Sequence, residues 1–132
     1  MSVQRLDPKP DVIVVKATVY GARERVETRL ILDTGAATTL IDPDILLVAG
    51  YDPAKAVRRQ AMTTASGHAY APLLAVRRLV VLGHAVGTID VVAHSLPPNV
   101  PVRGLLGMNF LRHFNLHLEF PARRLRMEGG RS

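Results

Sequence analysis

The chain has 132 residues, a hydrophobic fraction of 48% and a formal charge of +6, which predicts one packed, basic domain and argues against disorder. It has no cysteine, which excludes disulfides, thiol catalysis and thiolate metal sites. Only 5% of the residues are aromatic, so the core must be built mainly from Val, Leu, Ile and Ala.

The positive charge comes mostly from arginines, several of them in pairs: Arg58-Arg59, Arg77-Arg78 and Arg123-Arg124. A nucleic-acid site would gather such residues and interleave them with aromatic ones. Here they are dispersed, and no run of like charge is long enough for a binding tail. We therefore interpret the charge as a solvated basic surface and expect no nucleic-acid partner, although an acidic protein partner would suit it.

The N-terminus lacks the apolar stretch of a secretory signal. The longest apolar region, residues 69–96, is interrupted by an arginine pair, by His84 and by Asp90, so it cannot supply the roughly twenty apolar residues that cross a bilayer. We expect a cytoplasmic chain without membrane insertion. A segment of a longer, membrane-anchored protein would show the same pattern.

Residues 1–10 show no periodicity and are predicted to be an N-terminal lead-in. Residues 11–20 are β-branched and end at Gly21, and residues 26–33 alternate in polarity, so together they predict a hairpin. Residues 38–44 predict a short strand closed by a proline-containing turn, followed by a single helical turn from Ile45 to Val48.

Residues 58–76 are extended on both sides of a small, turn-prone centre, which predicts a second hairpin with a flexible tip at Ala65–His68. A third hairpin is expected to turn at Gly83-His84. The prolines of residues 95–104 predict an irregular loop after it.

Leu106, Phe110 and Phe114 stand four residues apart and predict a helix over residues 105–114. Residues 115–120 then alternate as a strand, and a turn leads to a last short strand near Met127. The pattern is that of an all-β domain, a small barrel or sandwich with one short C-terminal helix. We place the domain at residues 11–127 and a flexible tail at residues 128–132.

The strongest chemical signal is Asp33, which lies where the apolar run Leu30–Leu32 meets the small residues Thr34–Ala37. A carboxylate at a strand exit can point into a cleft, and Gly35 has no Cβ to block a facing backbone. The Thr34 hydroxyl can fix neighbouring backbone by a hydrogen bond. Asp-x-Gly is also common turn chemistry, so a purely turn-forming role stays open on these residues alone.

Three motifs in this order resemble the retropepsin-like aspartic proteases: LILDTGA at residues 30–36, TASGH at residues 64–68 and GLLGMNFL at residues 104–111. The resemblance covers residues 12–127, nearly the whole chain. It implies a closed barrel of the acid-protease type, a flap hairpin, a homodimer and aspartic endopeptidase activity on a peptide or protein substrate. No cofactor is implied, because the attacking nucleophile is water.

The resemblance implies that Asp33 is the catalytic acid, that Thr34 interlocks with its mate across a twofold axis, and that Gly35 offers its carbonyl to the substrate backbone. It further implies substrate contacts from Ala36, Ala37, Ala65, Ser66, Gly67 and His68, and structural support beneath the acid loop from Leu105, Leu106 and Gly107. The retroviral enzymes carry acidic, substrate-gripping residues after the position of Ala36, whereas this chain has Ala37 and Thr38. Substrate preference is therefore not transferable.

Peptide hydrolysis by this route needs two carboxylates that share one proton. The Asp-Thr-Gly motif occurs once: three other aspartates lie in or beside Asp-Pro turns, and Asp90 lacks the Thr-Gly that follows Asp33. The second acid is then Asp33 of another copy across a C2 interface. The strand at residues 115–120, as an edge strand, is a candidate for further dimer contacts.

Other side chains have more ordinary interpretations. His113 and His117 are four apart, as two metal ligands on a helix would be, but the strand pattern around His117 favours exposed polar positions, and we expect no metal site. Asp90 is expected to face outward from a strand. Ser66 has no His–Asp pattern to activate it, and His68 is equally well a substrate contact or a solvent-exposed loop residue.

The sequence leaves open two alternative functions from other functional classes. The first keeps the fold without the catalysis, as a silent dimerisation or peptide-binding module in which Asp33 only orders its loop. The second, ranked last, is a basic nucleic-acid-binding barrel, which would show steeply salt-dependent binding.

Overall fold

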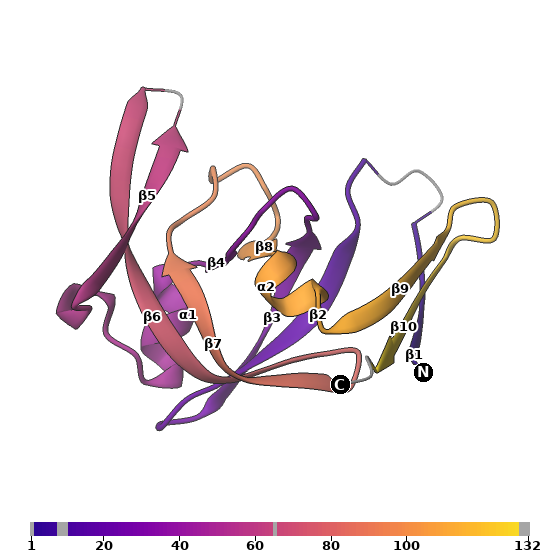
Figure 1. The fold of residues 1–132 in the computed structure, drawn as a ribbon, viewed down its shortest axis with the longest axis horizontal. Helices are drawn as coiled ribbons and strands as arrows, with labels where there is room; N and C mark the ends of the chain where they lie inside the picture. Colours follow the sequence, from indigo (N-terminus) through magenta and orange to yellow (C-terminus); the bar gives the residue numbers. More distant parts are fainter. Residues whose placement is uncertain (1, 8–10, 65, 130–132) are drawn as a thin grey trace.

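The protein was analysed as a computed structural model, which describes residues 2–7, 11–64 and 66–129. The fold is mostly β with few helices (Figure 1). The elements in chain order are β1 (Ser2–Arg5), β2 (Val14–Tyr20), β3 (Arg25–Leu32), β4 (Thr39–Ile41), α1 (Pro43–Ala49), the 3₁₀ turn η1 (Pro53–Lys55), β5 (Arg58–Thr64), β6 (Gly67–Val81), β7 (His84–Ala93), β8 (Gly104–Leu106), α2 (Met108–Leu111), β9 (Phe114–Glu119) and β10 (Arg124–Gly129).

Six strands close into a barrel in the order β2–β3–β8–β4–β7–β6, and β6 pairs back with β2. The pairs β3–β8 and β4–β7 are parallel, and the other neighbours are antiparallel. Alternate residues of each strand face the interior, as Val15, Ala17 and Val19 of β2 do, and these three are buried. The closed barrel that the resemblance implies is confirmed.

All three predicted hairpins are present, as β2–β3, β5–β6 and β6–β7. The last two share one continuous strand, because β6 runs for 15 residues and pairs with β5 near its start and with β7 further along. β5 lies outside the closed barrel and β6 is its one partner within the described part of the chain, so the β5–β6 hairpin projects from the barrel at the upper left of Figure 1. Of its predicted tip, Ala65 lies outside the described residues.

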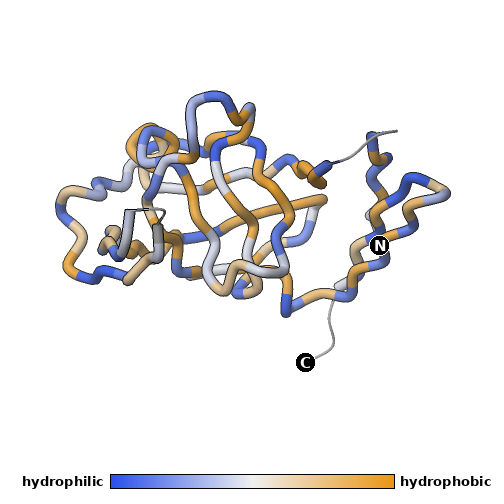
Figure 2. The backbone as a smooth tube through the Cα atoms, turned by 90° about the horizontal axis from the view of Figure 1, so that it is seen from above, coloured by the Kyte–Doolittle hydropathy of each residue, from blue (hydrophilic) through white to orange (hydrophobic). Residues whose placement is uncertain are grey.

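The chain termini form a second, three-stranded sheet in the order β1–β10–β9. Leu125 and Met127 of β10 are fully buried, so one face of this sheet packs against the barrel core. Figures 1 and 2 both show this terminal sheet at the end of the barrel opposite the β5–β6 hairpin. The strand predicted at residues 115–120 is therefore not isolated, since β10 pairs with one of its edges.

The sequence predicts no element in residues 1–10, whereas residues 2–5 form β1 and pair with β10. The signal was absent because the inward positions of β1 are polar. Gln4 is opposite the buried Leu125 and uses its side-chain amide to donate to the Val14 carbonyl at 2.8 Å. At the other end, β10 extends to Gly129, into the segment predicted to be a tail.

The predicted helix over residues 105–114 is wrong in extent, because α2 covers only Met108–Leu111. Leu106 belongs to β8, where it pairs with Leu32, and Phe114 begins β9. The apolar stripe does meet in the core, with the rings of Phe110 and Phe114 5.1 Å apart, but it is contributed by consecutive short elements. A spacing of four therefore indicated a shared core and not one helix.

The first helix is longer than the single turn predicted. α1 begins after Asp42, whose carboxylate accepts a hydrogen bond from the Asp44 N–H at 2.8 Å, and it ends at Gly50 in the left-handed conformation. Pro43 occupies the first helical position, where its missing N–H is no loss. The predicted Asp-Pro turn is thus the N-cap of this helix.

Candidate active site

Asp33 directly follows β3 and opens a tight loop to β4. Its N–H donates to the Leu106 carbonyl of β8 at 3.0 Å, and its carbonyl accepts from the Ala36 N–H at 3.2 Å. One carboxylate oxygen, Oδ1, accepts from the Gly35 N–H at 2.8 Å. The side chain is half-buried, and among the described residues the other oxygen, Oδ2, has no hydrogen-bond donor. The loop therefore fixes one oxygen and leaves its neighbour available.

The acid loop, residues 33–39, is held from below by the start of α2. The Ala36 carbonyl accepts from the Met108 N–H at 2.7 Å, and the Ala37 carbonyl accepts from the Asn109 N–H at 3.1 Å. The first N–H groups of a helix have no partner within it. Here they are satisfied by the loop that carries Asp33, so helix and loop fix each other.

The position of Gly107, between β8 and α2, has no room for a side chain. A Cβ at this position would lie 2.7 Å from the Thr38 carbonyl carbon and 2.8 Å from the Ala36 oxygen. Both are backbone atoms of the acid loop, so no side chain can rotate away to make room. Leu106 is fully buried and Leu105 half-buried beside it, and the supporting role that the resemblance implies for these three residues stays a prediction.

A side-chain network ties the end of the acid loop to α2 and β7. Asn109 Oδ1 accepts from both the N–H and the hydroxyl of Thr39, at 2.9 and 2.8 Å. The Thr39 hydroxyl oxygen in turn accepts from the Gly107 N–H at 3.1 Å, and Asn109 Nδ2 donates to the Asp90 carbonyl at 2.7 Å. Thr39 is completely buried, so the bonds to its N–H and hydroxyl satisfy groups that water cannot reach.

The other catalytic and substrate-binding residues that the resemblance implies lie in two separate places. Thr34, Gly35 and Ala37 are exposed in the acid loop, with Ala36 half-buried between them. Ser66, Gly67 and His68 are exposed at the end of the β5–β6 hairpin. In the view of Figure 1 that end and the acid loop are directed to the same side of the barrel.

The comparison with family models matches residues 19–113 to a family described as gag-polyprotein putative aspartyl protease. This stretch contains the acid loop, the hairpin and α2. The chain belongs to this retropepsin-like family.

A comparison of structures agrees with the family assignment. The domain is similar to the crystal structure of a retropepsin-like aspartic protease from Rickettsia conorii, with a TM-score of 0.72 and 19% identity over 95% of this chain and 87% of that one. At that identity the likeness shows the fold alone. No curated protein matches in the corresponding search. Family and fold together indicate a hydrolase of the aspartic-protease type.

Three other aspartates of this retropepsin-like domain have structural roles. Asp42 is buried, caps α1 and pairs with Arg103 at 3.1 Å. Asp52 caps η1 through the Ala54 N–H at 3.0 Å. Asp90 binds Arg58. Asp42 and Asp90 therefore have a donor for each carboxylate oxygen, whereas Asp52, like Asp33, has a donor only for Oδ1 among the described residues.

Side chains also join the acid loop to the base of the hairpin. The Thr38 hydroxyl donates to Gln60 Oε1 of β5 at 3.1 Å. Two positions earlier in β5, the Arg58 guanidinium donates to both oxygens of Asp90, at 2.7 and 3.2 Å. The hydrogen bond to Asp90 and its negative charge raise the pKa of Arg58, which therefore stays a cation throughout the range in which proteins fold.

The sequence did not reveal this network. The sequence predicts only that Asp90 faces outward from its strand, and it indicates no role for Gln60. Asn109 belongs to the predicted helix, also without a role of its own. Its position two residues after a glycine that permits close backbone approach was the available signal, whereas nothing local marks Gln60 as a neighbour of Thr38.

None of the described residues form a cluster of three or more potential metal ligands. His113 follows α2 and packs edge-on against Phe114, whereas His117 lies in β9 opposite Arg126. The two histidines thus belong to different elements. Among the described helices, none has the length and apolar character needed to span a membrane.

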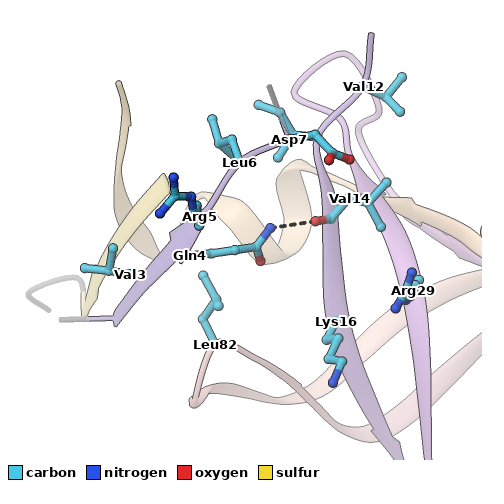
Figure 3. Close-up of a pocket in the computed structure, with 11 residues that line it drawn as sticks. Val3, Gln4, Arg5, Leu6, Asp7, Val12, Val14, Lys16, Arg29 and Leu82 are labelled. Carbon is cyan, nitrogen blue, oxygen red and sulfur yellow. Dashed lines mark hydrogen bonds between the residues drawn. The ribbon is translucent and has the colours of Figure 1, made fainter. Parts of the chain in front are cut away.

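A pocket of about 660 Å³ lies away from the acid loop, between β1 and the β2–β3 hairpin (Figure 3). Gln4 crosses it to reach the Val14 carbonyl, and exposed cations, Arg5, Lys16 and Arg29, stand at its walls. Asp33 does not line this pocket.

Proposed function

We propose that the protein is a homodimeric aspartic endopeptidase in which Asp33 of each subunit supplies one of the two catalytic carboxylates. The observation that carries this proposal is the state of Asp33. Its backbone is fixed by β8 and its Oδ1 by the Gly35 N–H, while Oδ2 has no donor among the described residues. It lies within the stretch that matches the aspartyl-protease family.

The chemistry requires the two carboxyl groups to lie about 3 Å apart and to share one proton, because both cannot be ionised at that distance. The ionised group takes a proton from a water molecule, which attacks the scissile carbonyl, while the protonated group donates to the carbonyl oxygen. No metal or cofactor is needed for either step. In this proposal Thr34 contacts its mate across the twofold axis and Gly35 offers its carbonyl to the substrate.

The dimer is proposed because the motif occurs once in the chain. The terminal sheet is a candidate for further contacts. Within the described residues β1 and β9 are its outer strands, and each has one edge without a backbone partner. Apolar side chains remain exposed beside the β9 edge, with Phe120 56% and Leu118 37% accessible. A C2 axis would place the same edge on both subunits, as an isologous contact requires.

The substrate in this proposal is an extended peptide that lies between the subunits and under both β5–β6 hairpins. Extended peptides are held largely through main-chain hydrogen bonds, which a strand-rich groove provides irrespective of sequence. The small side chains of Ala36 and Ala37 leave room for such a backbone beside Asp33. Ser66, Gly67 and His68 would contact it from the hairpin.

The test uses the full chain, a peptide library and the variant Asp33→Asn. We expect cleavage to fall by at least roughly 10³-fold, with the dimer and the thermal unfolding midpoint unchanged. Asp44→Asn is the matched control, since it also removes one exposed carboxylate but at the start of α1, and it should cleave like the wild type.

Mixed dimers separate one-acid from two-acid mechanisms. Equal amounts of wild-type and Asp33→Asn subunits, refolded together, should retain about a quarter of the wild-type activity if both acids are required, because random pairing leaves that share of wild-type dimers. A strict monomer that still cleaves peptides would contradict the proposal. A stable dimer that cleaves nothing would favour the alternative, a silent dimerisation or peptide-binding module.

A further inference from the structure

The outer strand of the projecting hairpin carries two polar side chains toward the barrel. Arg58 and Gln60 are two residues apart in β5, so they lie on the same face of the strand. Arg58 donates two hydrogen bonds to the Asp90 carboxylate of β7. Gln60 accepts a hydrogen bond from the Thr38 hydroxyl in the acid loop. One face of β5 is therefore attached to two different parts of the candidate active site.

The Arg58 contact also leads back to the acid loop. Asp90 binds Arg58 through its carboxylate. Its backbone carbonyl accepts a hydrogen bond from Asn109 Nδ2 at 2.7 Å. Asn109 holds both polar groups of Thr39. Two routes thus connect β5 to the loop that begins with Asp33: a direct one through Thr38 and an indirect one through Asp90 and Asn109.

We propose that Arg58, Gln60 and Asp90 are positioning residues, which set the angle of the β5–β6 hairpin over the acid loop and so the affinity for an extended peptide. This inference rests on the proposed peptidase function of Asp33. None of the three is proposed to touch the reacting atoms. They act by holding the base of the element that would cover the substrate.

The topology explains why side chains have this role. β5 lies outside the closed barrel and, among the described strands, pairs with β6 alone, so backbone pairing fixes it to one neighbour and leaves the angle of the hairpin to the barrel undefined. Contacts with a second element are needed to define the angle of the hairpin, and Arg58 and Gln60 provide them. A bidentate arginine–carboxylate pair suits this task because its two parallel bonds also fix orientation.

The same pair is too exposed to matter much for global stability. The Arg58 and Asp90 side chains are 47% and 46% accessible. Ion pairs with that exposure are screened by water and salt. Loss of the pair should therefore change the hairpin while leaving the unfolding transition nearly in place, which distinguishes a positioning role from a structural one.

The chain contains a matched control for this pair. Arg124 and Glu119 form an arginine–carboxylate contact of 3.1 Å in the terminal sheet, with 52% and 35% of the side chains accessible. It is chemically alike but lies at the opposite end of the barrel (Figure 1). Arg124→Ala thus reproduces the loss of a half-exposed ion pair without touching the hairpin.

The experiment compares the wild type with Arg58→Ala, Gln60→Ala, the double variant and Arg124→Ala, using steady-state peptide cleavage and amide hydrogen exchange. We expect Arg58→Ala and Gln60→Ala each to raise KM by roughly two- to tenfold with a smaller change in kcat, and the double variant to exceed either. Exchange should become faster in β5 and in the first half of β6. Arg124→Ala should change neither quantity.

Charge reversal gives the decisive rescue. Arg58→Asp alone should raise KM, because it places two carboxylates together, and adding Asp90→Arg should restore most of the lost affinity. Unchanged KM and unchanged hairpin exchange in the Arg58→Ala, Gln60→Ala double variant would overturn the inference. A wild-type protein that cleaves no peptide would instead defeat the proposed function, while the exchange data would still decide whether these residues hold the hairpin.

Discussion

The acid loop and the β5–β6 hairpin would face the same substrate, yet they are built in opposite ways. The acid loop is fixed by its neighbours: the carbonyls of Ala36 and Ala37 accept from α2, Thr39 is buried, and Gly107 fits against the loop backbone. The hairpin lies outside the barrel, and Tyr70 near its end is 71% exposed. One region is over-determined by its contacts, and the other is attached mainly at its base.

This difference corresponds to two physical requirements. A reacting carboxylate must be held within a fraction of an ångström of its working position, which favours backbone hydrogen bonds and close packing. An element that admits and covers a peptide must be able to change position, and few buried contacts make that possible. The contrast predicts that substitutions in the first region act on stability, whereas those in the second act on binding.

The largest effect is expected for Gly107→Ala. The added methyl group would meet backbone atoms of the acid loop at 2.7 to 2.9 Å, so the loop or α2 must move. Overpacking of this kind costs typically 1–3 kcal/mol, and we expect about 3 kcal/mol here because no flexible side chain can yield. Urea unfolding followed by circular dichroism measures it.

Gly87→Ala is the control for that measurement, since the nearest atom to its added Cβ is the Arg77 oxygen at 3.8 Å, an ordinary contact. It should leave the unfolding free energy unchanged or raise it slightly, because glycine weakens a strand interior. Equal destabilisation by both substitutions would show that the close approach of Gly107 does not determine the loop.

A smaller loss is expected for Asn109→Ala. The substitution leaves the N–H and hydroxyl of the buried Thr39 without an acceptor, and an unsatisfied buried group costs about 1–3 kcal/mol. Asn115→Ala removes the same amide from the exposed face of β9 and should change stability by less than about 0.5 kcal/mol. Thermal unfolding of the two variants side by side tests the contrast; equal midpoints would contradict it.

The sequence predicted best those parts of the fold that short-range pattern controls. Period-two alternation located the hairpins, and the order of motifs around Asp33 and Gly107 indicated a closed barrel of the retropepsin type. The prediction from sequence failed where the same residue spacing fits two different structures. The stripe of Leu106, Phe110 and Phe114 has helical spacing, yet consecutive short elements bring those side chains together.

The candidate site divides in the same way. Asp33 is indicated by its local setting together with the order of the three motifs, because Asp-x-Gly alone is also common turn chemistry. The hydrogen bond from Thr38 to Gln60 and the pair of Arg58 with Asp90 could not be predicted, since 22 and 32 residues separate their members and neither pair has a local signature. β1 was missed because its inward Gln4 is polar.

The smallest effect is expected for Tyr70→Ser, which tests the hairpin face by face. Residues opposite each other in an antiparallel pair share a face, so Tyr70 lies with Ala61 on one side, while Met62 lies on the other with Arg58 and Gln60. Because Tyr70 is mostly exposed, its loss should change stability by less than about 0.5 kcal/mol and leave KM unchanged.

Met62→Ala is the counterpart, on the face that is attached to the acid loop. Met62 is half-buried and packs against the small cluster of Leu40, Ala71 and Val92. If that face covers the peptide, this variant should raise KM severalfold while Tyr70→Ser does not. The reverse order of KM values would mean that the hairpin presents its other face to the peptide.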